Sequence, residues 1–181
     1  KEIKKNFKKY TILKPSLIFS VDDNFSTTFM KLLSLLPVMP LYYSGKTKFT
    51  PIHVTDMSEI IYQIVKRNLT GETIECVGPK EMTFKEIIIK LLKLIDKKRL
   101  LIPLPLFAAK IMAQIFEKLP NPLITKDQLS LLKYNSIISS KYKNNFDLGI
   151  PANKTFEEEI EKYSFNWKKG GQFNKKNFSE N

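Results

Sequence analysis

The sequence predicts an α/β protein in which a sheet is followed by a mostly helical lobe. Segments with strand-like patterning alternate with segments of helical apolar periodicity in the first part of the chain, and helical patterning dominates afterwards. With 181 residues, 43% of them apolar, the chain can bury a sizeable core. These observations exclude a wholly disordered or fibrous protein.

The first elements expected are the end of a helix, a strand and a second helix. Residues 1–9 are Lys-rich and resemble a helix tail, and Tyr10–Phe19 has the composition of a buried strand. Pro15 interrupts this strand, and a proline cannot donate to a ladder, so the backbone must become irregular there or form a sheet edge. Apolar residues on one face predict a helix over Phe25–Leu36.

The middle of the chain predicts two short strands around a helix. The strands are Phe49–Val54 and Thr73–Val77, and Gly78 and Pro79 close the second. We expect Asp56 to cap the intervening helix, because an Asp side chain accepts the free N–H groups of a first turn.

The last part of the chain carries two capping-box patterns. Thr83 and Glu86 have the T-x-x-E spacing and start a helix with a continuous apolar side. Arg99–Leu104 reads as a short extended segment. The remaining expected elements are a helix over Pro105–Leu119, a second capping box at Thr125 and Gln128, a loop at Asp147–Pro151 and a helix begun by Thr155. We therefore expect four regions: a helix end at 1–9, sheet and cleft-bordering segments at 10–78, a mostly helical lobe at 79–165 and a polar, disordered tail at 166–181.

Charge and residue counts exclude several classes of site. Lys and Arg number 30 against 18 Asp and Glu, giving a net charge of +12, but only Arg67 and Arg99 are Arg. Specific nucleic-acid readers rely on Arg, so we expect no specific nucleic-acid partner. Cys76 and His53 are the only residues of their kinds, which excludes Cys/His metal sites. No apolar run reaches the ~18 residues that span a bilayer, so no transmembrane segment is expected.

The chemistry-bearing residues each have a structural alternative. His53 follows a strand and reads either as a packed strand histidine or as a residue at the mouth of a cleft. Asp22 and Asp23 form a carboxylate pair or a solvated turn. Tyr-x-x-x-Lys occurs at Tyr10 and at Tyr62, about as often as chance predicts, and no glycine loop that could cradle a pyrophosphate is present.

Six segments in order carry a resemblance to a known family. They are LKPSLIF followed by Asp23 to Phe25, FTPIHVTDMSEII, ETIECVGPKEMTFKEII, LLIPLPLFAAKIMAQIFEKLP, PLITKDQLSLLKYNSI and DLGIP. Together they resemble the C-terminal half of atypical extended short-chain dehydrogenases/reductases. Within these, the chain is most similar to the NAD(P)H-binding accessory subunit of respiratory complex I and its bacterial relatives.

The resemblance implies the C-terminal part of a Rossmann-like NAD(P)-binding fold with a helical substrate lobe. The glycine loop and the catalytic Tyr-x-x-x-Lys helix of the family match nothing here, so we expect the N-terminal nucleotide-binding half to be absent, and we expect no catalytic residue in this chain. The implied cofactor is NAD(P)H, with NADH and NADPH both open, and its binding is expected to need the missing half.

The resemblance also implies site residues. Pro15, Ser16 and Leu17 match the loop that approaches the nicotinamide ring, and Lys14 stands where the family has Arg. Ser20 and Val21 replace a usual Gly-Pro. The implied substrate cleft contains Phe19, Asp23 and His53.

Three functions remain open at this point. The first is an accessory or assembly role associated with respiratory complex I. The second is an NAD(P)-dependent epimerase, dehydratase or reductase acting on a sugar nucleotide or an isoprenoid-like substrate. The third is a peripheral membrane-surface module that uses Leu104–Leu119 and the Lys excess. The expected location is the bacterial cytoplasm, with contact to the inner face of the membrane, or the mitochondrial matrix in a eukaryote.

Overall fold

The computed structural model describes residues 2–104, 130 and 132–174. The expected helix over Pro105–Leu119 and the capping box at Thr125 and Gln128 lie outside the described residues, as do residues 175–181 of the polar tail. The described chain forms two compact units, each assembled from three segments. Unit 1 comprises Lys1–Ser20, Phe49–Glu81 and Ser136–Phe156, and unit 2 comprises Val21–Lys48, Met82–Asn135 and Glu157–Asn181.

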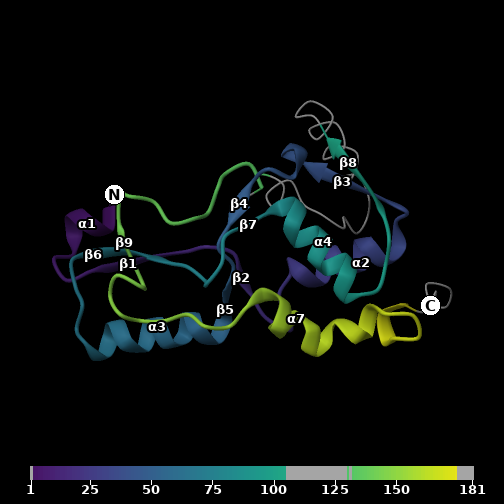
Figure 1. Cartoon of the computed structure of the whole chain (residues 1–181). Coiled ribbons are helices and arrows are strands. Elements are labelled where there is room, and N and C mark those ends of the chain that lie inside the picture. The colour runs from purple at the N-terminus through teal and green to yellow at the C-terminus, as the bar shows by residue number, and fades with distance from the viewer. Residues whose placement is uncertain (1, 105–129, 131, 175–181) are drawn as a thin grey trace. The chain divides into compact units, whose positions relative to one another are not determined.

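A parallel three-stranded sheet forms the frame of unit 1 (Figure 1). It follows a short helix, α1 (Glu2–Asn6), and its strands are β1 (Thr11–Pro15), β6 (Glu72–Cys76) and β9 (Lys143–Asn144), in the order β1-β6-β9. The register places Pro15 opposite Cys76. Because the strands are parallel, their carboxyl ends meet at one edge of the sheet.

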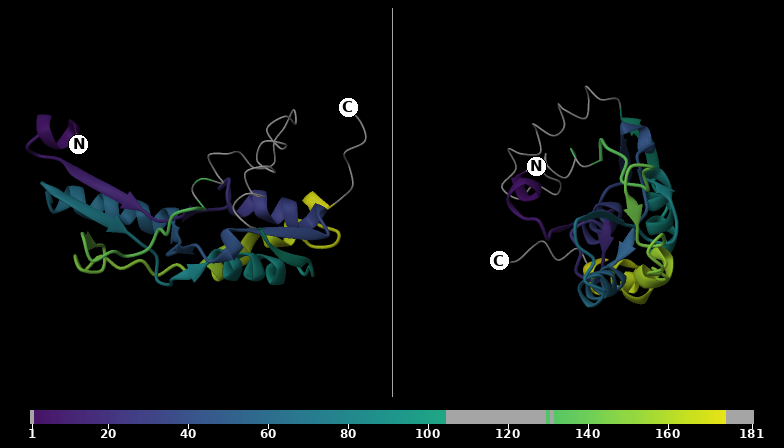
Figure 2. Two further views of the ribbon diagram at one scale, coloured as in Figure 1. Left: turned by 90° about the horizontal axis from the view of Figure 1, so that it is seen from above. Right: turned by 90° about the vertical axis from the view of Figure 1, so that its left-hand side faces the viewer.

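Helix α3 (Val54–Lys66) covers one face of this sheet, as the views in Figures 1 and 2 agree. Its inward residues repeat every three or four positions, and they meet alternate residues of β6. The resulting core consists of Ile52, Met57, Ile60, Ile64, Ile74, Cys76, Ile150 and Ala152. A parallel strand packed in this way is buried on both sides, which explains the nearly continuous burial of β6.

Prolines divide two of the expected strands. The strand expected over Tyr10–Phe19 is split into β1 and β2 (Ile18–Phe19), directly after Pro15. The strand expected over Phe49–Val54 is split into β4 (Lys48–Phe49) and β5 (Ile52–His53). The irregularity predicted from Pro15 is confirmed, and Pro51 has the same effect because its backbone also lacks an N–H donor.

The start of α3 differs from the expectation that Asp56 caps it. The helix begins at Val54, and His53 is its N-cap residue, with the backbone N–H of Thr55 donating to His53 Nδ1 at 3.3 Å. Asp56 lies inside the first turn, where its Oδ2 accepts a hydrogen bond of 2.9 Å from the backbone N–H of Lys154. The prediction was wrong because a distant loop, unseen in the local pattern, uses the Asp56 carboxylate.

Two helices form the core of unit 2. They are α2 (Ser26–Leu35) and α4 (Phe84–Leu94), and their contact includes the rings of Phe29 and Phe84, whose centroids are 5.2 Å apart. The predicted capping box of α4 is confirmed, with Thr83 and Glu86 hydrogen-bonded reciprocally. The strand β7 (Met82–Thr83) leads directly into this helix.

Unit 2 also contains a parallel two-stranded sheet of β3 (Val38–Tyr42) and β8 (Leu100–Leu104). The extended segment predicted at Arg99–Leu104 is confirmed as β8, whereas β3 and β9 were not anticipated. A 3-10 turn, η1 (Tyr43–Gly45), follows β3. The partner strand of β3 lies about sixty residues away in sequence. β3 itself contains Pro40, a residue that argues against a strand.

The C-terminal helix α7 (Phe156–Ser164) begins directly after Thr155. In unit 2, Glu157 of this helix forms an ion pair with Lys90 of α4. Two 3-10 turns, η2 (Phe165–Trp167) and η3 (Gln172–Asn174), continue the chain and bring the rings of Trp167 and Phe173 to 4.9 Å. Within the described residues, no helix has both the length and the apolar character needed to cross a bilayer.

Candidate functional site

The candidate site of unit 1 begins where β1 ends. The backbone N–H of Ser16 donates to the Cys76 carbonyl at 2.9 Å, whereas the next carbonyl, that of Leu17, accepts from the Ile52 N–H at 2.9 Å. The backbone after Pro15 thus stops pairing with β6 and pairs with β5 from the next residue on. This change occurs at the carboxyl end of parallel strands, which is where open α/β sheets bind ligands.

The Ser16 hydroxyl joins three separate segments of unit 1. Its Oγ donates to the Ser136 carbonyl at 2.6 Å and accepts from the Thr50 N–H at 3.0 Å. The side chain is buried, and the Thr50 N–H also reaches the Ser136 carbonyl at 3.1 Å. A serine hydroxyl can donate and accept at the same time. In this structure, backbone groups of Ser136 and Thr50 take up both capacities of the Ser16 hydroxyl.

The neighbours of Ser16 differ in exposure. Pro15 is exposed, and Leu17 is half-buried. Lys14, which stands where the family has Arg, is exposed, and its Nζ lies 4.7 Å from the centroid of the Tyr142 ring. At this distance an ammonium group is attracted to the face of an aromatic ring. Lys14 therefore links the end of β1 to the segment that precedes β9.

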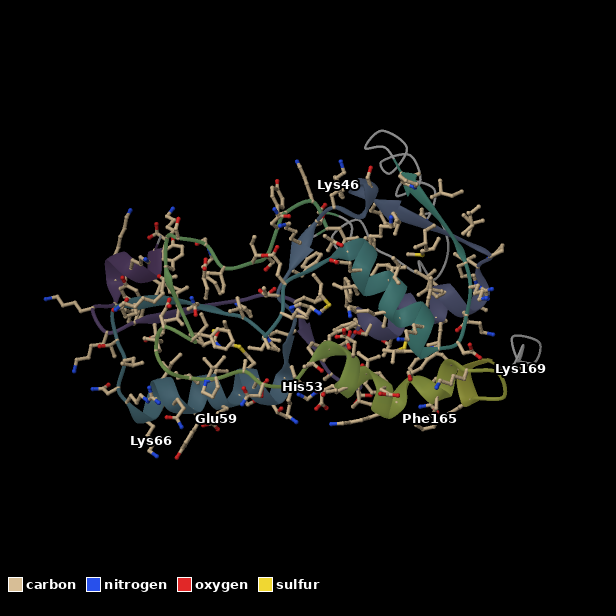
Figure 3. All side chains as sticks on the ribbon, viewed as in Figure 1. Lys46, His53, Glu59, Lys66, Phe165 and Lys169 are labelled. Carbon is tan, nitrogen blue, oxygen red and sulfur yellow. The ribbon has the colours of Figure 1, made fainter. Side chains whose placement is uncertain are left out.

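Phe19 and His53, two residues expected in the cleft, are brought together in unit 1. They are opposite each other in the β2–β5 pairing, and their ring centroids are 5.2 Å apart in an edge-to-face arrangement. Phe19 is fully buried and also contacts Phe156, whose ring centroid is 5.0 Å away. His53 Nδ1 lies 2.8 Å from the Thr55 hydroxyl (Figure 3 labels His53 at the start of α3). His53 therefore caps the start of α3 and packs against Phe19.

Asp23, the third residue expected in the cleft, belongs to unit 2. Its carboxylate accepts the backbone N–H of Ser26, and its carbonyl accepts the Thr27 hydroxyl. Both contacts support the first turn of α2, where a negative charge is favoured by the helix dipole. Burial, followed by the negative charge of Asp23, raises the pKa of Tyr163 in the same unit.

Three polar residues that the sequence analysis did not single out, Glu75, Ser139 and Asn145, connect the segment after residue 136 to strand β6 and the residue that follows it. Glu75 is buried on β6, and its carboxylate accepts both the backbone N–H and the hydroxyl of Ser139, each at 2.7 Å. Asn145 is fully buried, accepts from the Val77 N–H at 2.8 Å and donates to the Ile150 carbonyl at 3.1 Å. The available signal for Glu75 was its position between the apolar residues Ile74 and Cys76 of a predicted strand, since buried charges need partners.

The remaining reactive side chains are a thiol whose ionisation is disfavoured and a Tyr-Lys pair on the exposed side of α3. Burial raises the pKa of the Cys76 thiol to about 11. Tyr62 and Lys66 lie on the exposed side of α3, with Lys66 Nζ 5.6 Å from the Tyr62 ring centroid. Among the described residues, no group of His, Cys, Asp and Glu side chains is arranged to hold a metal ion.

The sequence has relatives among subunits of respiratory complex I. The chain is 26% identical over 152 residues to the mouse mitochondrial NADH dehydrogenase [ubiquinone] 1 alpha subcomplex subunit 9, a match that covers 83% of this chain and 40% of the relative. The Arabidopsis thaliana subunit of the same name is 26% identical over 172 residues, covering 89% and 42%. The 40 kDa subunit of NADH-ubiquinone oxidoreductase from Neurospora crassa is 27% identical over 146 residues, covering 80% and 38%. No family model matches the chain.

The chain is a homologue of these complex I subunits. It spans about two fifths of their length. The resemblance to the complex I accessory subunit is therefore supported by sequence relatives.

Solved structures share the Rossmann-like α/β fold. A dTDP-4-dehydrorhamnose reductase orthologue from Clostridium acetobutylicum superposes with a TM-score of 0.56 at 15% identity, covering 89% of this chain and 50% of that one. The dTDP-glucose 4,6-dehydratase from Streptomyces venezuelae, solved with NAD and TYD bound, gives 0.55 at 15% identity, covering 87% and 42%. The predicted fold class is confirmed, and this chain covers about half of each of these two structures.

Proposed function

We propose that this homologue serves in an NAD(P)H-binding accessory or assembly subunit of respiratory complex I. The observation that carries the proposal is the match of more than 80% of the chain to mitochondrial complex I subunits of an animal and a plant. The fold supports it, because a solved structure of the same fold has NAD bound. In a eukaryote this function places the protein in the mitochondrial matrix.

Within the proposed NAD(P)H site, the edge at Pro15, Ser16 and Leu17 faces the nicotinamide end of the cofactor. The Ser16 hydrogen bonds to Thr50 and Ser136 fix the backbone of this edge. Ser16 then acts by positioning, while the half-buried Leu17 supplies an apolar surface for the ring. Phe19 and His53 support the same edge through their ring contact and border the substrate cleft.

The phosphates of the cofactor need a different part of the protein. The sequence contains no glycine loop that could hold a pyrophosphate. We therefore propose that NAD(P)H binds tightly only when this chain is part of a longer protein, of the length seen in its relatives.

Loss of the gene in the source organism tests the accessory role. We expect reduced assembly of complex I on native gels, and restoration by the intact gene. Normal assembly and normal NADH:ubiquinone activity without the gene contradict the proposal. An epimerase, dehydratase or reductase would instead give a metabolic defect with complex I unaffected, so the experiment separates the two functions.

A substitution at Leu17 tests the cofactor edge. In the longer protein, Leu17→Trp fills the space proposed for the nicotinamide ring and should weaken NAD(P)H binding at least tenfold, about 1.4 kcal/mol. Ile18→Trp is the matched control, because Ile18 is the next residue and is 38% exposed. Equal affinity of the folded Leu17→Trp and Ile18→Trp variants, measured by calorimetry, refutes the placement of the ring.

A further inference from the structure

The β3–β8 sheet of unit 2 carries apolar residues on both faces. On one face Tyr42 is 2% exposed, whereas Val38, Leu100 and Ile102, toward the start of the two strands, are much more exposed. Met39 and Leu41 point to the opposite face, and each is only 1% exposed. Alternate residues point the other way, as side chains of a strand do. The register pairs Val38 with Leu100, and these two residues are 36% and 62% exposed.

Neighbouring residues extend this apolar surface. Ile102 follows Leu100 on the same face of β8 and is 43% exposed, and Leu35 at the end of α2 is 50% exposed. The turn between α2 and β3 is held close to β8, since the Leu100 N–H donates to the Pro37 carbonyl at 3.2 Å. Val38, Leu100 and Ile102 therefore form one exposed surface on this face of the sheet, which we call the aliphatic patch.

A basic turn adjoins the aliphatic patch. Residues 93–99 contain Lys93, Lys97, Lys98 and Arg99 against a single acidic residue, Asp96. Arg99 lies directly before Leu100, and its guanidinium donates from Nε to the Leu33 carbonyl at 2.8 Å and from Nη2 to the Ser34 carbonyl at 3.2 Å. Lys98 is exposed beside it.

The backbone of this turn has a fixed conformation. Asp96 adopts a left-handed conformation with φ 53° at the end of α4, and the Lys97 N–H donates to the Leu92 carbonyl at 3.0 Å. This is the hydrogen bond of a Schellman helix end. The Lys side chains are thus presented from an ordered backbone next to the aliphatic patch.

We propose that the aliphatic patch and the basic turn bind the surface of an anionic lipid bilayer. Aliphatic side chains insert at the boundary of headgroups and acyl chains, and adjacent Lys residues interact with anionic headgroups. A protein partner is disfavoured by composition, because the centres of protein interfaces are enriched in aromatic residues and depleted in Lys. This inference rests on unit 2 alone and does not depend on NAD(P)H binding.

Vesicle flotation of the full chain tests the proposal. We expect binding to phosphatidylcholine vesicles that contain phosphatidylglycerol, and little binding to phosphatidylcholine alone. The double variant Leu100→Ser/Ile102→Ser should bind at least about fivefold less. Val65→Ser is the matched control and should bind as the wild type does, because Val65 is 73% exposed on α3 of unit 1.

Charge reversal separates the basic turn from the general Lys excess. Lys98→Glu should lower binding at least about fivefold, whereas Lys66→Glu, at an exposed position of unit 1, should change it much less. Circular dichroism confirms that each variant is folded. Equal losses for the two charge reversals, or unchanged binding of the serine double variant, overturn the proposal.

A direct measurement of insertion avoids reliance on loss of binding. Tryptophan introduced as Leu100→Trp should be quenched by brominated lipid more strongly than tryptophan introduced as Val65→Trp, with Trp167 as a background common to both. Equal quenching contradicts insertion of the aliphatic patch. Self-association without vesicles that Leu100→Ser abolishes would assign the patch to a second copy of the chain and also overturn the proposal.

Discussion

Removal of the Ser16 hydroxyl should measurably weaken unit 1 without unfolding it. Ser16→Ala deletes one hydrogen bond to the Ser136 carbonyl and one from the Thr50 N–H. A typical intramolecular hydrogen bond contributes about 1 kcal/mol, so two would give about 2 kcal/mol. The two backbone partners remain bonded to each other at 3.1 Å, and no buried group is left unpaired. We therefore expect a loss of about 1–2 kcal/mol in the free energy of unfolding.

Thermal denaturation provides the assay for this loss. For a protein of this size, 1 kcal/mol corresponds to about 2–4 °C, so the Tm of Ser16→Ala should fall by about 2–8 °C. Ser140→Ala, at an exposed position of the same segment as Ser136, is the control and should leave the Tm within about 1 °C. An unchanged Tm for Ser16→Ala, or a fall as large for Ser140→Ala, refutes the role given to the Ser16 network.

Two further predictions concern close packing and thiol chemistry in unit 1. Gly78→Ala should destabilise the protein by about 3 kcal/mol or more in denaturant titration, because a Cβ there would lie 1.6 Å from the Pro51 carbonyl oxygen. Gly149→Ala should cost only about 1 kcal/mol, since Gly149 has φ +66° but open space around it, and equal costs would contradict the packing argument. The rise in the pKa of the Cys76 thiol from 9.0 to about 11 should slow its reaction with a disulfide reagent at pH 8 about a hundredfold relative to the urea-unfolded chain, and the native rate should increase as the pH rises toward 11. A native rate equal to the unfolded one would show that Cys76 is accessible and ionised.

Local patterns predicted most elements of the fold. The apolar rows of α2 and α4, and the box formed by Thr83 and Glu86, lie within single segments of the chain, so their physics is visible in sequence. The interruption at Pro15 was predictable for the same reason, because a missing N–H donor is a property of the residue itself. By contrast, β3 and β9 depend on partners far away in sequence, and a short strand has little local signal.

The candidate site shows the same division. The family resemblance pointed to Ser16, as part of the loop that approaches the nicotinamide ring, and Pro15 predicted an irregular backbone next to it. Only the tertiary structure supplies its partners, since Ser136 is 120 residues away and Thr50 is 34 residues away. The same applies to Asp56, which looks like a helix cap locally but accepts the Lys154 N–H from a loop 98 residues further along.

The sequence by itself therefore determined the α/β class, the helices with their apolar faces and the family resemblance, because these depend on short-range periodicity and residue order. The tertiary structure decided which polar groups are satisfied by the protein and which apolar surface stays exposed. Glu75 illustrates the first outcome through its bonds to Ser139, and Leu100 illustrates the second. Both outcomes depend on which distant segments meet, and no local pattern of side chains specifies that.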